Sequence, residues 1–175
     1  GGKTWSAAEK LPDGNIGPVK NKPVLLENGQ LLCPSSTGGD GWKIHFEVTK
    51  DFGKSWHKIG PLTVKDSIDA IQPSILVHGN GTLQLLARSR NRALVQSWST
   101  DNGETWSPLE KSTLPNNNSG TDAVTMMDGR HVLVYNHVLP PGNLAKGPRT
   151  PLNVSVSKDG KNWSAALILE DSPIS

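Results

Sequence analysis

The segment Ser99-Thr-Asp-Asn-Gly-Glu-Thr-Trp106 decides the fold, because it recurs along the chain. Thr49-Lys-Asp-Phe-Gly-Lys-Ser-Trp56 repeats it, and Ser157-Lys-Asp-Gly-Lys-Asn-Trp163 repeats it with one residue fewer. Gly1-Gly-Lys-Thr-Trp5 matches the end of a fourth copy. The tryptophans at positions 5, 56, 106 and 163 are 51, 50 and 57 residues apart. This spacing indicates a structural unit of about 50 residues that is repeated along the chain.

Each full copy follows the signals of a β-hairpin and of an alternating strand. Asn28-Gly29, Asn80-Gly81 and Asp128-Gly129 lie between apolar runs, and such pairs are strong hairpin signals. Alternating apolar residues follow within 42–48, 94–98 and 152–156, and a further strand is expected from the tryptophan of each copy. The sequence therefore predicts an all-β fold with four antiparallel strands per unit, which is typical of a β-propeller blade.

These boundaries predict one propeller domain. Residues 1–19 are expected to end a preceding blade, and residues 20–69, 70–119 and 120–175 are expected to form one blade each. Within each repeat, hydroxyl and Asp side chains are expected to bond a tight turn, glycine to supply a positive φ, and tryptophan to anchor the turn in the core. The residues assigned to this structural role are Asp51, Trp56, Asp101, Gly103, Trp106, Asp159 and Trp163.

The composition excludes several other classes of protein. The 175 residues include 18 Lys+Arg, 16 Asp+Glu, 18 Gly and 13 Pro, with a net charge of +2. The basic residues are dispersed, which argues against a nucleic-acid surface, and no apolar run is long enough to span a membrane. The single Cys33 excludes an internal disulfide, and the histidines lack metal spacing, so we expect no metal and no cofactor.

Four N-glycosylation sequons are compatible with a secreted or extracellular location. They begin at Asn80, Asn117, Asn153 and Asn162.

The repeat resembles the Asp-box, or BNR repeat, of sialidases and related propellers. The stretches Gly17–Pro23, Ala70–Pro73 and Tyr135–His137 are also similar to the sialidase-like BNR family of bacteria and plants. The resemblance covers essentially the whole chain and implies about three blades of a ring that usually has six. It further implies a glycoside hydrolase that acts on terminal acidic sugars of glycans, without a metal or organic cofactor.

The order of strands places binding residues at one end of the blades. The Asn-Gly and Asp-Gly turns and the repeats share one end, and the residues before each first strand and after each second strand share the other. Polar, charged and aromatic residues fill this second end, where loops on a rigid scaffold commonly carry function. The candidate substrate-binding residues here are Lys22, Ser35, Gln72, Arg88, Arg90, Asn136 and His137.

Two groups carry the predicted chemistry. Arg88 and Arg90 stand two residues apart at a strand end, so both are expected to face the centre of the ring and to hold a sugar carboxylate by paired hydrogen bonds. Asp122 lies at a strand start and is the candidate catalytic acid/base. Tyr135, the only tyrosine, is expected to pack within its strand, and Glu47 with His45 is a weaker catalytic candidate.

The chain departs from the sialidase pattern that the resemblance implies, namely an arginine triad, a Tyr/Glu nucleophile pair and an Asp acid/base. Gln72-Pro73 stands where an Arg–Ile–Pro motif is expected, Arg149 is a third arginine in a loop, and spacing reveals no Tyr/Glu pair. The alternative is a lectin-like propeller that binds carbohydrate without catalysis. A true half-ring would expose apolar blade faces, so it is expected to self-associate.

Overall fold

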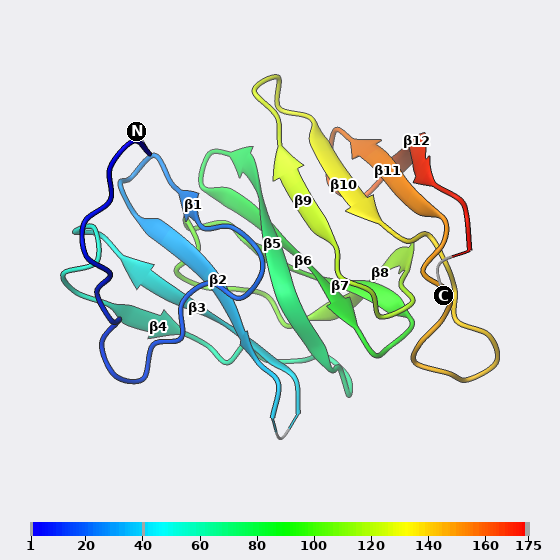
Figure 1. Ribbon diagram of the computed structural model, residues 1–175, viewed down its shortest axis with the longest axis horizontal. Coiled ribbons are helices and arrows are strands. Elements are labelled where there is room, and N and C mark those ends of the chain that lie inside the picture. Colours follow the sequence, from blue (N-terminus) through cyan, green and yellow to red (C-terminus); the bar gives the residue numbers. More distant parts are fainter. Residues whose placement is uncertain (1, 40, 174–175) are drawn as a thin grey trace.

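The computed structural model describes residues 2–39 and 41–173, which form twelve β-strands and no helix. Within this part of the chain, no helix is therefore long enough to cross a membrane. The strands make three four-stranded antiparallel sheets that lie side by side (Figure 1). The sheets comprise β1 (Val24–Leu25), β2 (Leu31–Thr37), β3 (Lys43–Thr49) and β4 (His57–Ile59); β5 (Ala70–Gly79), β6 (Thr82–Ser89), β7 (Ala93–Ser99) and β8 (Glu110–Pro115); and β9 (Asp122–Thr125), β10 (His131–Tyr135), β11 (Leu152–Ser157) and β12 (Trp163–Glu170).

The predicted all-β fold and its four-stranded units are confirmed. In each sheet the strands pair in chain order, so neighbouring strands in a sheet are also neighbours in the sequence. The hairpins fall where the sequence places them, with Gly29 and Gly129 at φ values of 80° and 83°. The turn at Asn80-Gly81 takes positive φ at both residues, as a tight hairpin between twisted strands requires.

The Asp-box residues are joined by a repeated set of hydrogen bonds. The Asp101 carboxylate accepts bonds from Thr105 N at 2.9 Å and from Ser99 Oγ at 2.7 Å. Gly103 N donates to Ser99 Oγ at 2.9 Å, and Trp106 Nε1 donates to Gly103 O at 2.9 Å. The first and third copies make equivalent bonds around Asp51, Trp56, Asp159 and Trp163, although the third is one residue shorter. The box therefore closes a turn and fixes its tryptophan.

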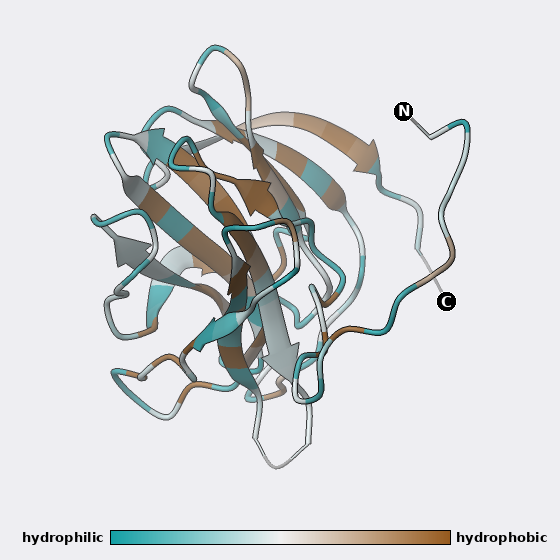
Figure 2. Cartoon of the chain, turned by 90° about the vertical axis from the view of Figure 1, so that its left-hand side faces the viewer, coloured by the Kyte–Doolittle hydropathy of each residue, from teal (hydrophilic) through white to brown (hydrophobic). Residues whose placement is uncertain are grey.

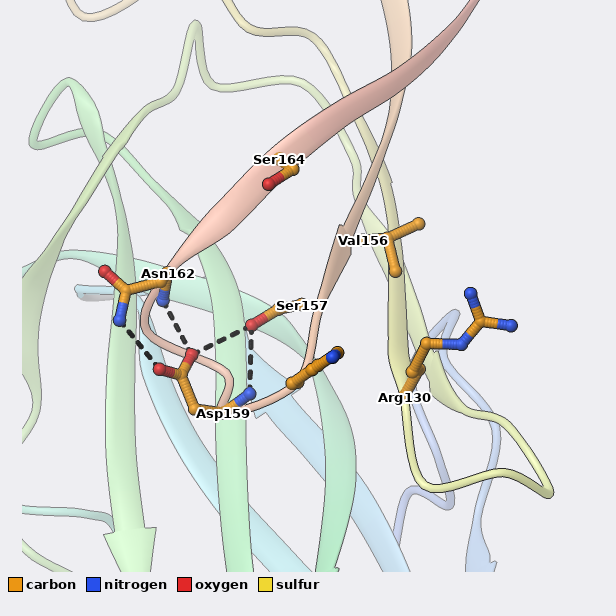
Figure 3. A pocket seen from close by; sticks show the side chains of 7 residues that line it. Arg130, Val156, Ser157, Asp159, Asn162 and Ser164 are labelled. Atoms are coloured by element: carbon orange, nitrogen blue, oxygen red, sulfur yellow. Dashed lines mark hydrogen bonds between the residues drawn. The ribbon is translucent and has the colours of Figure 1, made fainter.

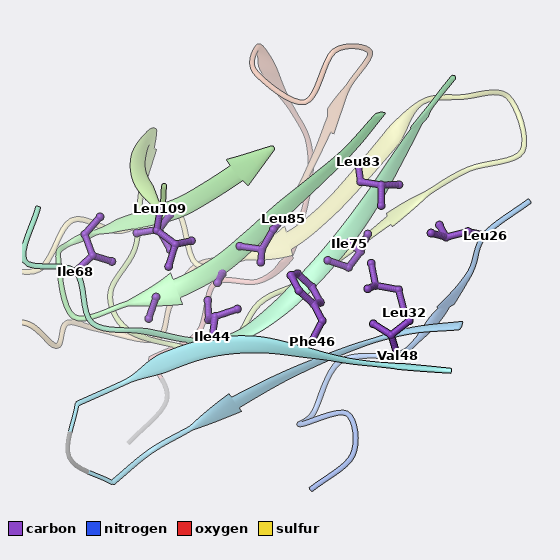
Figure 4. Close-up of a cluster of buried hydrophobic side chains, with 13 residues drawn as sticks. Leu26, Leu32, Ile44, Phe46, Val48, Ile68, Ile75, Leu83, Leu85 and Leu109 are labelled. Atoms are coloured by element: carbon purple, nitrogen blue, oxygen red, sulfur yellow. The ribbon is translucent and has the colours of Figure 1, made fainter. Parts of the chain in front are cut away.

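Two apolar clusters hold adjacent sheets together. Figure 4 shows the first, in which Phe46 and Leu32 of the first sheet face Ile75 and Leu85 of the second. Trp106 packs against this cluster, with its ring 4.6 Å from that of Phe46. The second cluster joins β5–β8 to β9–β12 and includes the buried Tyr135. Hydrophobic and hydrophilic bands alternate along the strands (Figure 2), because successive side chains point to opposite faces.

The central strand β5 contacts β2 and β3 on one side and β9 on the other. Residues 2–23 form no strand, and the Trp5 side chain is 87% exposed. This segment is tied to the first sheet instead, since Ile16 N and Gly17 N donate to the buried Glu47 carboxylate at 2.8 and 2.7 Å. The assignment of residues 1–19 to a preceding blade, and the other blade boundaries, stay predictions.

Candidate functional site

Strand register brings the predicted site residues to one end of the sheets. Ile71 pairs with Arg88 at the start of β5 and the end of β6, and Asp122 pairs with Val134 at the start of β9. The Asn80-Gly81 hairpin and the Asp-boxes lie at the other end of these strands. The end that carries Arg88 and Asp122 is called the loop end below.

A cavity of about 230 Å³ opens at the loop end. Arg88 and Arg90 both line it, and Arg149 joins them from the long loop between β10 and β11. Trp42 forms one wall, with the Arg88 and Arg90 guanidinium carbons 5.1 and 4.2 Å from the centre of its ring. Cation–π contacts of this kind fix the planar guanidinium groups. The remaining lining residues are Asn117, Asn118, Lys146 and Gly147.

The cavity is short of negative charge. Within residues 2–39 and 41–173, one carboxylate approaches these cations, that of Asp69 at 3.6 Å from Arg90. Arg88 Nε is buried and has no hydrogen-bond partner within that part of the chain. Burial lowers the pKa of Arg88, and the charges of Arg149 and Arg90 lower it further. A buried N–H donor without an acceptor is costly, so this edge of the Arg88 guanidinium favours a bound acceptor such as an anion.

Asp122 lies near these arginines but not among the residues that line the cavity. Its carboxylate pairs with Lys22 Nζ at 2.8 Å and accepts bonds from Ser74 Oγ at 3.0 Å and Ala123 N at 2.9 Å. Burial alone raises the pKa of Asp122, but the Lys22 ammonium and these hydrogen bonds outweigh it and lower the pKa overall. Asp122 is therefore ionised at neutral pH, which suits a base and disfavours a general acid.

Lys20 also lies at the loop end, and sequence reasoning did not single it out. Its ammonium donates to Thr121 O at 2.8 Å, and its stem passes over Gly120, where a Cβ would come within 2.9 Å of Lys20 Cε. Burial lowers the pKa of Lys20, Asp122 opposes this shift, and Arg88 and Lys22 add to it. Lys20 thus lies close enough to both Asp122 and Arg88 to be influenced by their charges, and its only sequence signal is its place beside Asn21 at the loop end.

Three residues at the loop end have a left-handed backbone. Lys20, Gln72 and Asn118 have φ values of 68°, 59° and 65°, a conformation that costs about 1–3 kcal/mol for residues other than glycine. Each lies just before or within the first strand of its sheet. Gln72 Oε1, Asn118 Oδ1 and Thr121 Oγ1 are also buried without a hydrogen-bond partner in the described residues. Strain and unpartnered polar atoms therefore gather around the predicted site.

Other predicted residues have partners within the chain. Ser35 is buried and donates to Gly17 O at 2.7 Å. Asn136 Nδ2 donates to Arg149 O and to Pro151 O, so it supports the loop that carries Arg149. His137 is exposed and bonds the hydroxyl of Tyr135. A role for Ser35, Asn136 and His137 in binding substrate stays a prediction.

The weaker catalytic candidates are buried or bonded within the fold, as expected for residues that stabilise the structure. Tyr135 is 1% exposed within the second cluster, and burial raises its pKa. Glu47 lies 3.3 Å from His45 and holds the N-terminal segment. Cys33 is buried, which raises the pKa of its thiol to about 11. The described residues contain no group of three or more side chains of metal-binding type.

A larger hollow of about 420 Å³ lies at the other end of the molecule, against the third Asp-box (Figure 3). Asp159 lines it, but its carboxylate already accepts bonds from Asn162 Nδ2 and Asn162 N, each at 2.7 Å. Ser157 Oγ is bonded to Asp159 as well, at 3.0 Å. Because these groups serve the turn, the hollow presents little unsatisfied chemistry, and the arginine cavity is the better candidate site.

The fold and the repeated boxes define an Asp-box β-propeller, of which this chain supplies part of the ring. All of residues 1–175 match the family model described as the BNR repeat-like domain, so the chain belongs to that family. A comparison with curated proteins finds no significant match.

Solved structures confirm the fold. A protein of unknown function from Dyadobacter fermentans is 16% identical with a TM-score of 0.71, over 96% of this chain and 49% of its own. The NanB sialidase from Streptococcus pneumoniae is 17% identical with a TM-score of 0.59, over 82% of this chain and 22% of its own. An N-acetylgalactosamine deacetylase from F. plautii, solved with blood group B trisaccharide, is 16% identical with a TM-score of 0.56. The match covers 82% of this chain and 50% of the deacetylase. The chain thus spans half or less of these proteins.

Proposed function

We propose that this chain forms part of a sialidase-like glycoside hydrolase that acts on terminal acidic sugars of glycans. The observation that carries the proposal is the buried, unpartnered Nε of Arg88 in a cavity that Arg90 and Arg149 also line. A sugar carboxylate would supply the missing acceptor through two parallel charge-assisted hydrogen bonds. The fold shared with a sialidase supports the same conclusion.

The residues near the cavity suit distinct roles in this reaction. Arg88 and Arg90 hold the carboxylate, and the Asn118 Oδ1 acceptor, which is buried and unpartnered, receives a sugar hydroxyl. Asp122, kept ionised by Lys22, acts as a base or stabilises positive charge in the transition state. A group that protonates the leaving oxygen is then needed from elsewhere, since Asp122 is poorly suited to that role.

The state of Asp122 also favours the alternative function, a lectin-like propeller that binds acidic sugars without catalysis. Tyr135 is buried with its hydroxyl bonded to His137, and no Glu is bonded to it in the described part of the chain. The chain therefore has the elements of a binding pocket and lacks a visible nucleophile pair.

The test separates binding from catalysis. N-acetylneuraminic acid and its uncharged methyl ester are titrated against the protein, its Arg88→Lys variant and an Arg130→Lys control at the opposite end. We expect the wild type to prefer the acid, and Arg88→Lys to weaken acid binding about ten- to a hundredfold, the effect of losing roughly 1.5–3 kcal/mol from a charged hydrogen bond. The Arg130→Lys variant should behave as wild type.

Equal binding of acid and ester by the wild type would mean that the carboxylate is held elsewhere. Hydrolysis is followed in parallel with 4-methylumbelliferyl glycosides of N-acetylneuraminic acid and of glucuronic acid. Release of the fluorophore supports the hydrolase, and binding without release supports the lectin-like alternative.

A further inference from the structure

The arginine cavity holds more positive charge than one carboxylate needs. Four cationic side chains line it, those of Arg88, Arg90, Lys146 and Arg149. Arg90 alone has a carboxylate within 4.0 Å in the described chain, that of Asp69. Lys146 and Arg149 make no ion pair with residues 2–39 or 41–173. After one carboxylate binds at Arg88 and Arg90, Lys146 and Arg149 on the β10–β11 loop, called the second wall below, still lack an anionic partner in the described chain.

This second wall is held in place by contacts distant in sequence. Gly147 N donates to Asn117 O at 3.3 Å, and Asn117 Nδ2 donates to Pro148 O. Arg92 Nη1 donates to Leu144 O at 3.1 Å. A Cβ at Gly147 would come within 3.1 Å of Pro140 and 3.3 Å of Asn117, so the loop packs closely on the β8–β9 connection. Lys146 and Arg149 therefore line the cavity from a fixed segment of the β10–β11 loop, whereas Arg88 and Arg90 line it from the end of β6 and the residue that follows.

An unpartnered polar atom in the cavity lining favours a hydroxylated ligand. Asn118 is 8% exposed, lines the cavity, and its Oδ1 has no partner in the described chain. The cavity volume of about 230 Å³ lies below the roughly 300–1,000 Å³ of sites for drug-sized ligands. The opening therefore suits one sugar unit and its substituents better than an extended chain.

We propose that this cavity binds a sugar unit that carries two anionic groups, one at Arg88 and Arg90 and a second at Lys146 and Arg149. This inference rests on the proposed function, because it assigns the first anion to the same carboxylate clamp. The second group is a sulfate ester or a second carboxylate on the same unit. The carboxylate is planar and the sulfate ester is tetrahedral, and both present oxygen acceptors that Lys and Arg bind. The substrate class is thus a doubly acidic glycan end rather than a singly acidic one.

The test uses calorimetric titration of the protein with matched probes. These are methyl glucoside, methyl glucuronide, the 2-, 3- and 4-sulfate esters of methyl glucuronide, and the carboxymethyl ethers at the same positions. We expect methyl glucuronide to bind better than the glucoside, and at least one doubly acidic probe to bind about tenfold better still, as one further charged hydrogen bond provides. The sulfate and carboxymethyl probes show which second group the site prefers.

Lys146→Met tests the assigned residue, because Lys146 is exposed and its replacement leaves the fold intact. We expect this variant to lose the tenfold gain while still binding methyl glucuronide better than methyl glucoside. Lys158→Met, the same change at the Asp-box end, is the matched control and should retain the gain.

The two proposals fail in different ways. If methyl glucuronide binds and no doubly acidic probe binds better, or if Lys146→Met keeps the gain, the second anion site is wrong and the carboxylate clamp stands. If methyl glucuronide binds no better than the neutral glucoside, the clamp fails, and this inference fails with it.

Discussion

Gly160 occupies a turn position where any side chain would displace the buried amide of Gln84. Its φ is 69°, and a Cβ there would overlap Gln84 Oε1 and lie 2.9 Å from His78 Cε1. Gln84 is fully buried and donates to Gly160 O at 2.8 Å. The third Asp-box is thus locked to the second sheet by a contact that only glycine permits.

Gly160→Ala should therefore destabilise the protein by more than the cost of placing alanine at a positive φ, because its Cβ also overlaps Gln84. Gly129→Ala is the matched control, since Gly129 has a φ of 83° and nothing within 4 Å of its Cβ position. We expect Gly129→Ala to cost about 1 kcal/mol. Gly160→Ala should cost roughly 1–3 kcal/mol more from overpacking. Urea unfolding measures both values, and equal losses would show that the Gln84 contact relaxes freely.

The site residues differ in how far local sequence reveals them. Arg88 and Arg90 were predictable because two residues at a strand end share a face. Lys146 was not predictable, and Arg149 was noted only as a third arginine in a loop, because their place at the cavity depends on how Asn117 and Asn136 hold that loop. Trp42 was predicted only as a strand residue, and its stacking on both arginines depends on how the first two sheets pack.

Strands β5, β6, β9 and β10 are connected by a chain of hydrogen bonds that requires neutral histidines. Thr125 Oγ1 accepts from Val77 N, so it donates to His131 Nδ1 at 3.0 Å. His131 Nε2 then donates to His78 Nδ1 at 3.1 Å, and His78 Nε2 donates to Gln84 Oε1 at 3.1 Å. A proton added to His78 Nδ1 would set two N–H groups against each other and break the bond from His131, and a proton on His131 Nδ1 would force the Thr125 hydroxyl to turn and accept.

Stability should accordingly fall in mild acid. Burial and the neighbouring His78 lower the pKa of His131 to about 4, against the opposing charge of Asp159. Because the folded pKa lies below the unfolded value, the unfolded chain binds the extra proton between pH ~6.5 and ~4. The contribution of His131 is complete above pH ~6.5, and about 3 kcal/mol is lost as the pH falls to ~4.

Comparing the wild type with the His131→Gln variant separates the contribution of His131 from that of the carboxylates, because the carboxylates titrate in both proteins. The difference in unfolding free energy between wild type and this variant should narrow as the pH is lowered from 7 to 4, measured by denaturant unfolding. A constant difference for His131→Gln would contradict the assigned network.

Strand positions were predictable because each inner face packs on a neighbouring sheet. The alternating stretches 42–48, 94–98 and 152–156 correspond to β3, β7 and β11, where a period of two separates core from surface residues. The conformation of residues 2–23 was harder to predict from the sequence, because it depends on hydrogen bonds to the buried Glu47 and not on local alternation. Local patterns therefore define the sheets, and tertiary contacts define the segments between them.

The edge strand of the third sheet is β12, and it carries an apolar strip that remains exposed within the described residues 2–39 and 41–173. Leu167, Ile168 and Leu169 are 58%, 57% and 51% exposed. Three consecutive exposed apolar residues on an edge strand are unusual, because such strands carry free backbone groups that pair with other chains. In a propeller this strand would lie against a neighbouring sheet.

Residues 1–175 expressed alone should therefore self-associate through β12. Sedimentation at micromolar concentration is expected to give a mass above the 18.8 kDa of one chain. A Leu167→Lys, Leu169→Lys double variant should shift the mass toward 18.8 kDa, because lysine on an edge strand opposes pairing. Met127→Lys, at a hairpin residue that is also fully exposed, is the control and should leave association unchanged. A wild-type chain that sediments as a monomer would show that the uncovered strip is tolerated in water, and β12 would then not be an interface.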